Sequence, residues 1–191
     1  MKKSPKHPAR AEAESPSLLL RSSWQPVNIG DVSHTPGLLA LLEKHLPDWR
    51  VTLWSNIERP DENAALKARF PGLRIVHGSL AEDGTASDAA LGRALETGDF
   101  LLHGSGPSIV ARRDLDTWRS VFKKPYGIYG VTIDPLAGFV DAAGRSANTS
   151  TLEEQRSMVA RLPSDHLDPF LRSILEGARF VFCRDSLSLD Y

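Results

Sequence analysis

The chain has 191 residues, and its 41% hydrophobic and 25% charged residues are typical of a globular domain rather than of a disordered chain. The 23 Lys and Arg residues almost balance the 24 Asp and Glu residues, so no overall basic charge predicts binding to nucleic acid. A single cysteine excludes an internal disulfide, and no apolar run is long enough for a membrane span or a signal peptide. These features predict a cytoplasmic protein.

Residues 1–17 contain three prolines and four Lys or Arg residues, but no Leu, Ile, Val or aromatic residue. Such a segment buries too little apolar surface to offset the entropy lost on ordering it. We therefore expect a disordered basic tail over 1–17 and one folded domain over 18–191.

Short apolar runs alternate with amphipathic stretches along the folded domain. The runs predict strands at 18–24, 50–54, 73–77, 99–102, 126–132 and 179–183. The amphipathic stretches predict helices at 36–46, 62–70, 86–96, 114–122, 151–161 and 170–177. This alternation predicts right-handed crossovers and a Rossmann-like α/β fold, with a parallel sheet flanked by helices.

Helix signals support several of these boundaries. Pro36 suits the first turn of the first helix, with Thr35 as its N-cap. Gly98 is expected as the C′ glycine that ends the third helix. Thr151 and Glu154 have the spacing of a capping box.

Ligands of open parallel sheets bind beyond the carboxyl ends of the strands, so the residues after strands are the candidates for a site. After the first strand, Gly30 would let the backbone approach a ligand, and Asp31 could accept hydrogen bonds from sugar hydroxyls or act as a base. The alternative is that Asn28 and Asp31 form a turn that only caps the helix.

Two further strand ends carry candidate residues. After the fourth strand, His103 precedes a glycine-rich run with Gly104 and Gly106, which either approaches a ligand or makes a tight turn. After the sixth strand, Arg184 and Asp185 form a charged pair that either binds a ligand or makes a local ion pair or helix cap.

Familiar catalytic signatures are absent from the sequence. Ile109 occupies the third glycine position of a dinucleotide fingerprint, and no Gly-Lys dipeptide or Gly-x-Ser-x-Gly elbow occurs. The histidines show neither an i, i+4 pair nor a cysteine partner at zinc spacing, so no metal site is predicted.

Three motifs at strand ends, in this order and spacing, resemble those of the polysaccharide pyruvyl transferase family. The motif residues are Asn28, Gly30 and Asp31; Gly104 and Gly106; and Arg184, Asp185 and Ser188. The likeness spans about residues 18–191, and Ser105 stands where the family has the middle glycine of three.

The resemblance implies transfer of a pyruvyl group from phosphoenolpyruvate, as donor substrate, to a sugar of a polysaccharide or its precursor. It implies no resident cofactor. It also implies a GT-B-like fold of two Rossmann domains, of which this chain matches the N-terminal half and lacks the second. Partners are then a saccharide acceptor and either a second half-protein or another copy of the chain.

On this interpretation Asp31, His34 and His103 are the candidate acid–base residues, because ketal formation needs a placed acid and base. The candidate substrate-binding residues are Asn28, Gly30, Thr35, Gly104, Ser105, Gly106, Arg184, Asp185 and Ser188.

Other interpretations stay open at this point. The chain could be a truncated copy, one piece of a split protein, or an inactive sugar-binding remnant. A GT-B-like glycosyltransferase fragment and a non-catalytic saccharide-binding or partner-docking domain are the alternatives to pyruvyl transfer. If a second domain is missing, we expect an exposed apolar patch or self-association, with residues 179–191 involved.

Overall fold

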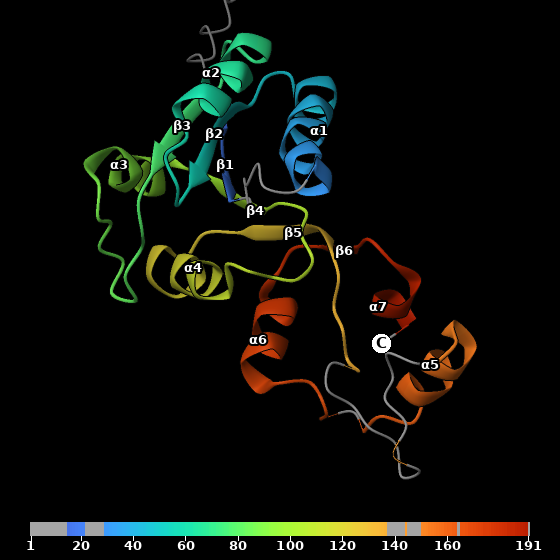
Figure 1. The fold of residues 1–191 in the computed structure, drawn as a ribbon. Helices are drawn as coiled ribbons and strands as arrows, with labels where there is room; N and C mark the ends of the chain where they lie inside the picture. The colour runs from blue at the N-terminus through green and yellow to red at the C-terminus, as the bar shows by residue number, and fades with distance from the viewer. Residues whose placement is uncertain (1–14, 22–28, 137–143, 145–149, 164, 191) are drawn as a thin grey trace, which may run out of the picture.

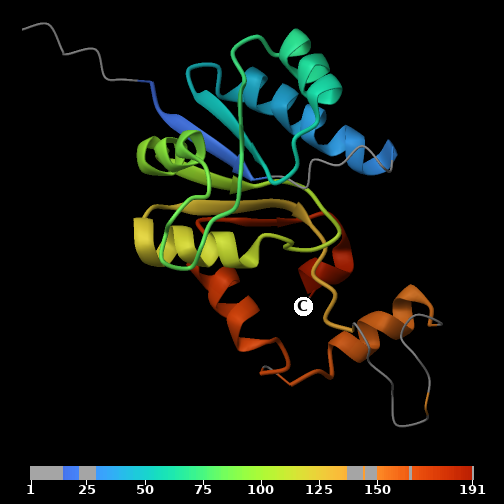
Figure 2. The ribbon, with the colours of Figure 1, turned by 60° about the vertical axis from the view of Figure 1, so that its left-hand side comes forward.

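The computed structural model describes residues 15–21, 29–136, 144, 150–163 and 165–190. Within this part of the chain, six strands form one parallel sheet in the order β3-β2-β1-β4-β5-β6 (Figures 1 and 2). The strands are β1 (Ser17–Arg21), β2 (Arg50–Ser55), β3 (Arg74–His77), β4 (Phe100–His103), β5 (Tyr126–Val131) and β6 (Val181–Cys183). The predicted Rossmann-like α/β fold is confirmed, and the strand order is that of doubly wound nucleotide-binding folds.

Helices connect the strands and flank the sheet (Figure 1). They are α1 (Ile29–His45), α2 (Pro60–Arg69), α3 (Ala89–Thr97), α4 (Arg112–Thr117), the π-helical turn η1 (Trp118–Phe122), α5 (Leu152–Val159), α6 (Pro169–Gly177) and α7 (Ser186–Asp190). The sequence does not predict α7, and it merges α4 and η1 into one helix. None of the described helices is long and apolar enough to cross a membrane.

The folded domain begins earlier than residue 18. The backbone N–H of Arg50 donates to the carbonyl of Pro16 (2.9 Å), and its Nε donates to the carbonyl of Ser15 (3.1 Å). The N–H of Ser17 donates to Asp99 Oδ2 (2.8 Å). Residues 15–17, which the sequence places in the tail, therefore contact Arg50 and Asp99, which are far away in the sequence and leave no local signal. Residues 1–14 lie outside the described residues.

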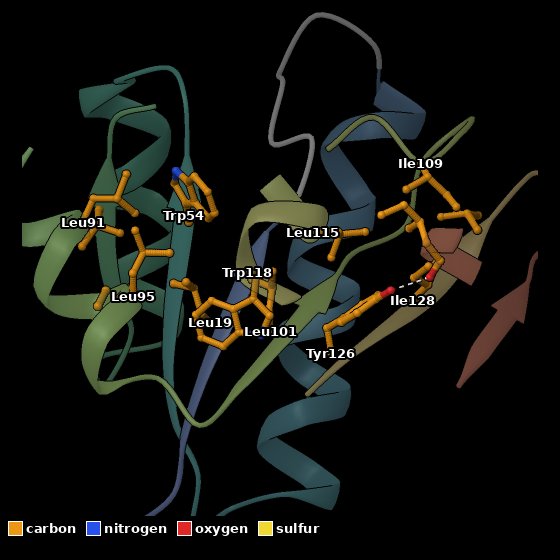
Figure 3. Packing of buried hydrophobic residues seen from close by; sticks show 14 of the residues in the cluster. Leu19, Trp54, Leu91, Leu95, Leu101, Ile109, Leu115, Trp118, Tyr126 and Ile128 are labelled. Atoms are coloured by element: carbon orange, nitrogen blue, oxygen red, sulfur yellow. Dashed lines mark hydrogen bonds between the residues drawn. The ribbon is translucent and has the colours of Figure 1, made fainter. Parts of the chain in front are cut away.

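One face of the sheet is covered by α3, α4, η1 and α6 (Figure 2), and Figure 3 shows side chains of the cluster buried there. Strand side chains alternate between faces, and on this side Leu19, Leu101 and Ile128 belong to a fully buried cluster. Trp118 and Tyr126 also belong to this cluster, and the polar atoms of both side chains have partners. Trp118 Nε1 donates to the carbonyl of Pro125 (3.0 Å), and Tyr126 Oη donates to that of Ile174 (2.5 Å).

The other face packs against α1 and α2. Leu18, Leu20 and Leu53 of the strands meet Leu38 and Leu42 of α1 in a second buried cluster. The leucines at i and i+4 of α1 form the stripe that faces this part of the sheet. Both layers of the fold therefore follow from the period of two in the strands and of 3.6 in the helices.

Two helix-end predictions have different outcomes. The capping box is confirmed, since the N–H of Glu154 donates to Thr151 Oγ1 (3.3 Å) and the N–H of Thr151 donates to Glu154 Oε2 (2.7 Å). Gly98 ends α3, but its φ of −68° is not left-handed. A Cβ there would lie 2.9 Å from the carbonyl oxygen of Ala94, so close packing rather than backbone conformation favours glycine.

Candidate functional site

The strand order reverses between β1 and β4. From β1 the chain adds β2 and β3 on one side, and it then crosses to the other side of β1, where β4, β5 and β6 follow. Backbone pairing sets Arg21, the last residue of β1, opposite His103, the last residue of β4. Ligands of open α/β sheets bind outside such a switch point. The first and fourth strands are therefore neighbours, and the prediction that residues 28–35 adjoin residues 103–108 stays a prediction.

The structure corrects the start of the first helix. The sequence predicts Pro36 in the first turn and Thr35 as the cap, but α1 begins at Ile29 and contains both residues. Thr35 is buried, and the buried Leu38 and Leu42 follow it on the same helix. Proline in a helix interior removes one backbone hydrogen bond, and here the packing of the leucine stripe against the sheet outweighs that cost.

Most of the segment predicted as a ligand loop therefore belongs to the first turns of α1. Gly30 and Asp31 lie in the first turn, and Asn28 lies outside the described residues. The first N–H groups of a helix lack intrahelical acceptors and favour a bound anion. His34 is half-buried one turn further on, and its Nδ1 has no hydrogen-bond partner among the described residues.

Arg21 is a buried cation at the switch point, and the sequence analysis missed it. Its Nε donates to Asp114 Oδ2 of α4 at 2.7 Å, and its guanidinium lies 4.8 Å from the ring centroid of Trp54. The sequence contains a signal for this residue, since Leu18, Leu19 and Leu20 predict a buried strand and Arg21 follows them directly. A charge is therefore expected at the carboxyl end of that strand. Asp114 could not be found in this way, since its place beside Arg21 depends on the packing of α4.

His103 is buried beside Arg21, with only 1% of its surface exposed. Burial, reinforced by the positive charge of Arg21, lowers the pKa of His103 from 6.5 to about 4, although the backbone of Gly104 opposes the shift. Its Nε2 accepts the N–H of Ala111 at 3.4 Å, so the ring proton resides on Nδ1. At neutral pH this side chain is a neutral hydrogen-bonding group and not a charged acid. Its catalytic role stays a prediction.

The glycine-rich run after β4 stays against the sheet. The N–H of Gly104 donates to the carbonyl of Arg21 (2.9 Å), and that of Gly106 donates to the carbonyl of Gly130 (3.3 Å). Ser105 Oγ donates to the same Gly130 carbonyl (2.8 Å). The run therefore bridges the ends of β1 and β5 in front of β4, and the Ser105 hydroxyl has a protein partner.

The residues after β6 form a helix cap. Asp185 Oδ1 accepts the N–H of Ser188 in α7 (2.8 Å), and Ser188 Oγ accepts the N–H of Ile133 after β5 (2.8 Å). Burial raises the pKa of the Asp185 carboxyl, but hydrogen bonds from Ser188 and Thr132 and the charge of Arg184 outweigh it, so the pKa lies below its usual 3.8. These contacts agree with the helix cap that the sequence offered as the alternative to a ligand site. Ligand binding by Arg184, Asp185 and Ser188 stays a prediction.

The three predicted motifs share the carboxyl edge of the sheet but are not equally close. The segments after β1 and β4 follow neighbouring strands, whereas β6 lies two strands beyond β4, a separation of about 10 Å. The third motif therefore lies farther along this edge, whereas the first two follow neighbouring strands.

A second polar cluster lies at the carboxyl ends of β2 and β3 and was not predicted. Asn63 Nδ2 of α2 is 3.3 Å from His77 Nε2, and Arg59 immediately precedes the helix. Arg59 Nε, Asn63 Oδ1 and His77 Nδ1 are buried without a hydrogen-bond partner among the described residues. Among those residues, no group of three His, Cys, Asp or Glu side chains could hold a metal ion.

Comparisons with known proteins add no functional assignment. No family model matches the sequence, and no curated protein matches it. A conserved protein from Enterococcus faecalis V583 is similar in structure, with 11% identity, a TM-score of 0.44, and coverage of 92% of this chain and 96% of the other. The yeast methylglyoxal/isovaleraldehyde reductase Gre2, solved with NADPH, has 13% identity, a TM-score of 0.40, and coverage of 86% of this chain and 56% of the reductase. Likenesses at this level carry no argument about activity.

Proposed function

We propose that the carboxyl edge around β1 and β4 binds a saccharide acceptor and supports pyruvyl transfer from phosphoenolpyruvate. One observation carries the proposal: three motifs from distant parts of the sequence, which resemble those of polysaccharide pyruvyl transferases, follow β1, β4 and β6 at the same edge of one parallel sheet. This is the edge where open α/β sheets bind their ligands.

The reaction defines what this edge must supply. Two sugar hydroxyls form bonds to C2 of phosphoenolpyruvate, the bond from C2 to the phosphate oxygen breaks, and phosphate leaves. One hydroxyl proton goes to the methylene carbon, which becomes a methyl group, and the other goes to phosphate. A base near the hydroxyls, an acid near the methylene and cationic groups near the donor are therefore required.

The residues at the switch point divide these tasks in the proposal. Asp31, in the first turn of α1, accepts the hydrogen bonds of the acceptor hydroxyls, and His34 lies one turn away as the second candidate base. His103 orients a substrate oxygen as a neutral donor from Nδ1. Arg21 supplies positive charge toward the donor, although Asp114 balances part of it.

A nucleotide sugar is the alternative donor, and the strand order favours it, since the order β3-β2-β1-β4-β5-β6 is the one that binds nucleotides in doubly wound folds. The buried polar cluster of Asn63 and His77 then lies where the nucleoside half of such a ligand is held in those folds.

The test combines turnover with binding. Purified protein is incubated with a panel of saccharides and either phosphoenolpyruvate or nucleotide sugars, and phosphorus NMR follows the release of inorganic phosphate or nucleoside diphosphate. Phosphate release that depends on the saccharide supports the proposal. Nucleoside diphosphate release supports the alternative donor, and saccharide binding without turnover supports a non-catalytic binding domain.

A matched pair of variants assigns the acceptor site. We expect Asp31→Ala to weaken saccharide binding in calorimetric titration by about 1.5–3 kcal/mol, because a charge-assisted hydrogen bond is lost. Asp61→Ala removes the corresponding first-turn carboxylate of α2 and should leave binding unchanged. Each change should cost at most about 1 kcal/mol of stability through the helix dipole. Unchanged affinity in Asp31→Ala would remove the acceptor site from α1.

A further inference from the structure

The face of the sheet that carries α1 has an aromatic trough over β4, β5 and β6. Its aromatic floor consists of Phe100, Tyr129, Phe180 and Phe182. Leu18, Leu102, Trp49 and the adjoining side of α1 line the same open groove, whose volume is about 510 Å³. The rings form a continuous series, with centroids 6.0 Å apart for Phe100 and Phe180, 5.0 Å for Phe180 and Phe182, and 6.1 Å for Tyr129 and Phe182. Phe182 is 55% exposed although it is the largest apolar side chain of β6.

The floor is built by close packing. A Cβ on Gly127 would lie within 3 Å of the Phe180 ring, so glycine at this position of β5 lets the ring lie against the strand. A solvent-exposed sheet face usually carries polar side chains and not aromatic rings packed closely on a glycine. The apolar patch expected in residues 179–191 is thus present at Phe182, and Leu189 is 75% exposed in the same segment.

A parallel sheet normally has helices on both faces. Here α1 and α2 cover the β1–β3 half of this face, while α3, α4 and α6 lie on the opposite face (Figures 1 and 2). No helix of the described residues lies over the trough. Three neighbouring strands are about 10 Å wide, which matches the 10–12 Å diameter of one α-helix.

The outward side of α1 has an unusual composition for a surface helix. Ser33, Gly37, Ala40 and Leu41 are exposed, and no Asp, Glu, Lys or Arg occurs between Val32 and Leu42. Surface helices normally carry charged side chains toward solvent. The small residues leave room for close approach, since nothing lies within 4 Å of the position that a Cβ on Gly37 would take.

We propose that the trough and the outward side of α1 form a self-complementary interface with a second copy of this chain. In a two-fold arrangement, the α1 helix of each copy lies in the trough of the other, so that two antiparallel helices form one layer between two sheets. Each α1 then packs its leucine stripe on its own sheet and its uncharged stripe on the partner's aromatic floor. The same surface meets itself, as a two-fold interface requires.

Size and charge agree with a weak to moderate dimer. The 17 residues of α1 span about 25 Å, and two helix diameters give a footprint of about 500 Å² per copy. The total of about 1,000 Å² is at the lower end of specific interfaces, for which we expect micromolar dissociation. A net charge of −1 gives little repulsion between copies. The interface shares α1 with the proposed acceptor site, but Phe182 and Ala40, which test it, are not among the residues of that site. Failure of this inference and failure of the proposed function are therefore distinguishable.

Sedimentation velocity tests the interface across concentrations of about 1–200 µM, under reducing conditions that keep Cys183 as a thiol. We expect wild-type protein to shift from 21.0 kDa to twice that mass. Phe182→Glu and Ala40→Glu should each weaken the dimer at least about tenfold, because a carboxylate is buried without a partner. Leu152→Glu, at a 52% exposed leucine of α5, is the matched control and should dimerise as wild type does.

Circular dichroism and thermal melts establish that each variant is folded, which the exposure of all three positions favours. Wild-type protein that stays monomeric over the whole range overturns the proposal, whether or not an apolar dye binds the trough. A dimer that neither Phe182→Glu nor Ala40→Glu weakens, or that Leu152→Glu weakens equally, also overturns it.

Discussion

The two faces of the sheet are built from the same strands but differ in what covers them. On one face, Trp118 and Tyr126 are almost fully buried beneath α4 and α6. On the other, Phe182 and Tyr129 lie beside α1 without a described helix above them. The strand pattern is alike on both sides, so the difference comes from the connections after β3, which place α3, α4 and α6 on one face. Apolar side chains show which surfaces must be covered, and chain connectivity decides which ones are.

The largest effect should distinguish a covered aromatic residue from an uncovered one. We expect Trp118→Ala to lower the free energy of unfolding by about 3–5 kcal/mol, because it leaves a cavity in a fully packed cluster. Phe182→Ala should cost less than about 0.5 kcal/mol when urea unfolding is measured at a protein concentration that favours monomer. Similar losses in the two variants would mean that both faces are equally covered.

The pH dependence of stability should report the burial of His103 on the covered face. The unfolded chain binds this proton near pH 6.5, whereas the folded protein binds it only near pH 4. The contribution of His103 to the free energy of unfolding is therefore complete above about pH 6.5. It declines as the pH falls and is lost below about pH 4. Its size is up to about 3 kcal/mol. In His103→Gln, urea unfolding across this window should show a flatter pH profile, and an unchanged slope would contradict the burial of a neutral ring.

A pair of tyrosines sharpens the comparison at the level of one hydroxyl. Tyr126→Phe should cost about 1–2 kcal/mol, because the buried carbonyl of Ile174 loses its donor. Tyr129→Phe on the open face keeps the edge contact with Phe182 and should be close to neutral in thermal or urea unfolding. A larger loss of stability in Tyr129→Phe than in Tyr126→Phe would contradict the prediction that only the Tyr126 hydroxyl stabilises the fold.

The smallest effect is a stabilising one on the open face. Gly37 lies inside α1 with open space around the position that a Cβ would take, so Gly37→Ala should raise stability by about 0.5–1 kcal/mol through helix propensity. Gly98→Ala on the covered face should instead destabilise, since its Cβ would contact the carbonyl oxygen of Ala94. Differential scanning calorimetry measures the melting temperatures of both variants. Shifts of the same sign in Gly37→Ala and Gly98→Ala would contradict the prediction.

The candidate site was predicted more coarsely than the fold. The sequence placed His103 at the carboxyl end of a strand, because a glycine-rich run after an apolar strand is a local signal. It misplaced the start of α1, since Pro36 resembles a first-turn proline until the packing of Leu38 and Leu42 is known. It missed the pairing of Arg21 with Asp114, which are 93 residues apart in the sequence.

The sequence by itself determined the six strands, most of the helices and the parallel Rossmann-like sheet, because apolar periodicity and capping residues act over a few neighbouring residues. Only the tertiary structure decided the strand order, the neutral state of His103 beside Arg21, the helix cap made by Asp185 and Ser188, and the uncovered aromatic trough. Each of these depends on contacts between segments far apart in the chain. Burial and electrostatic interactions arise from such contacts, and no local pattern records them.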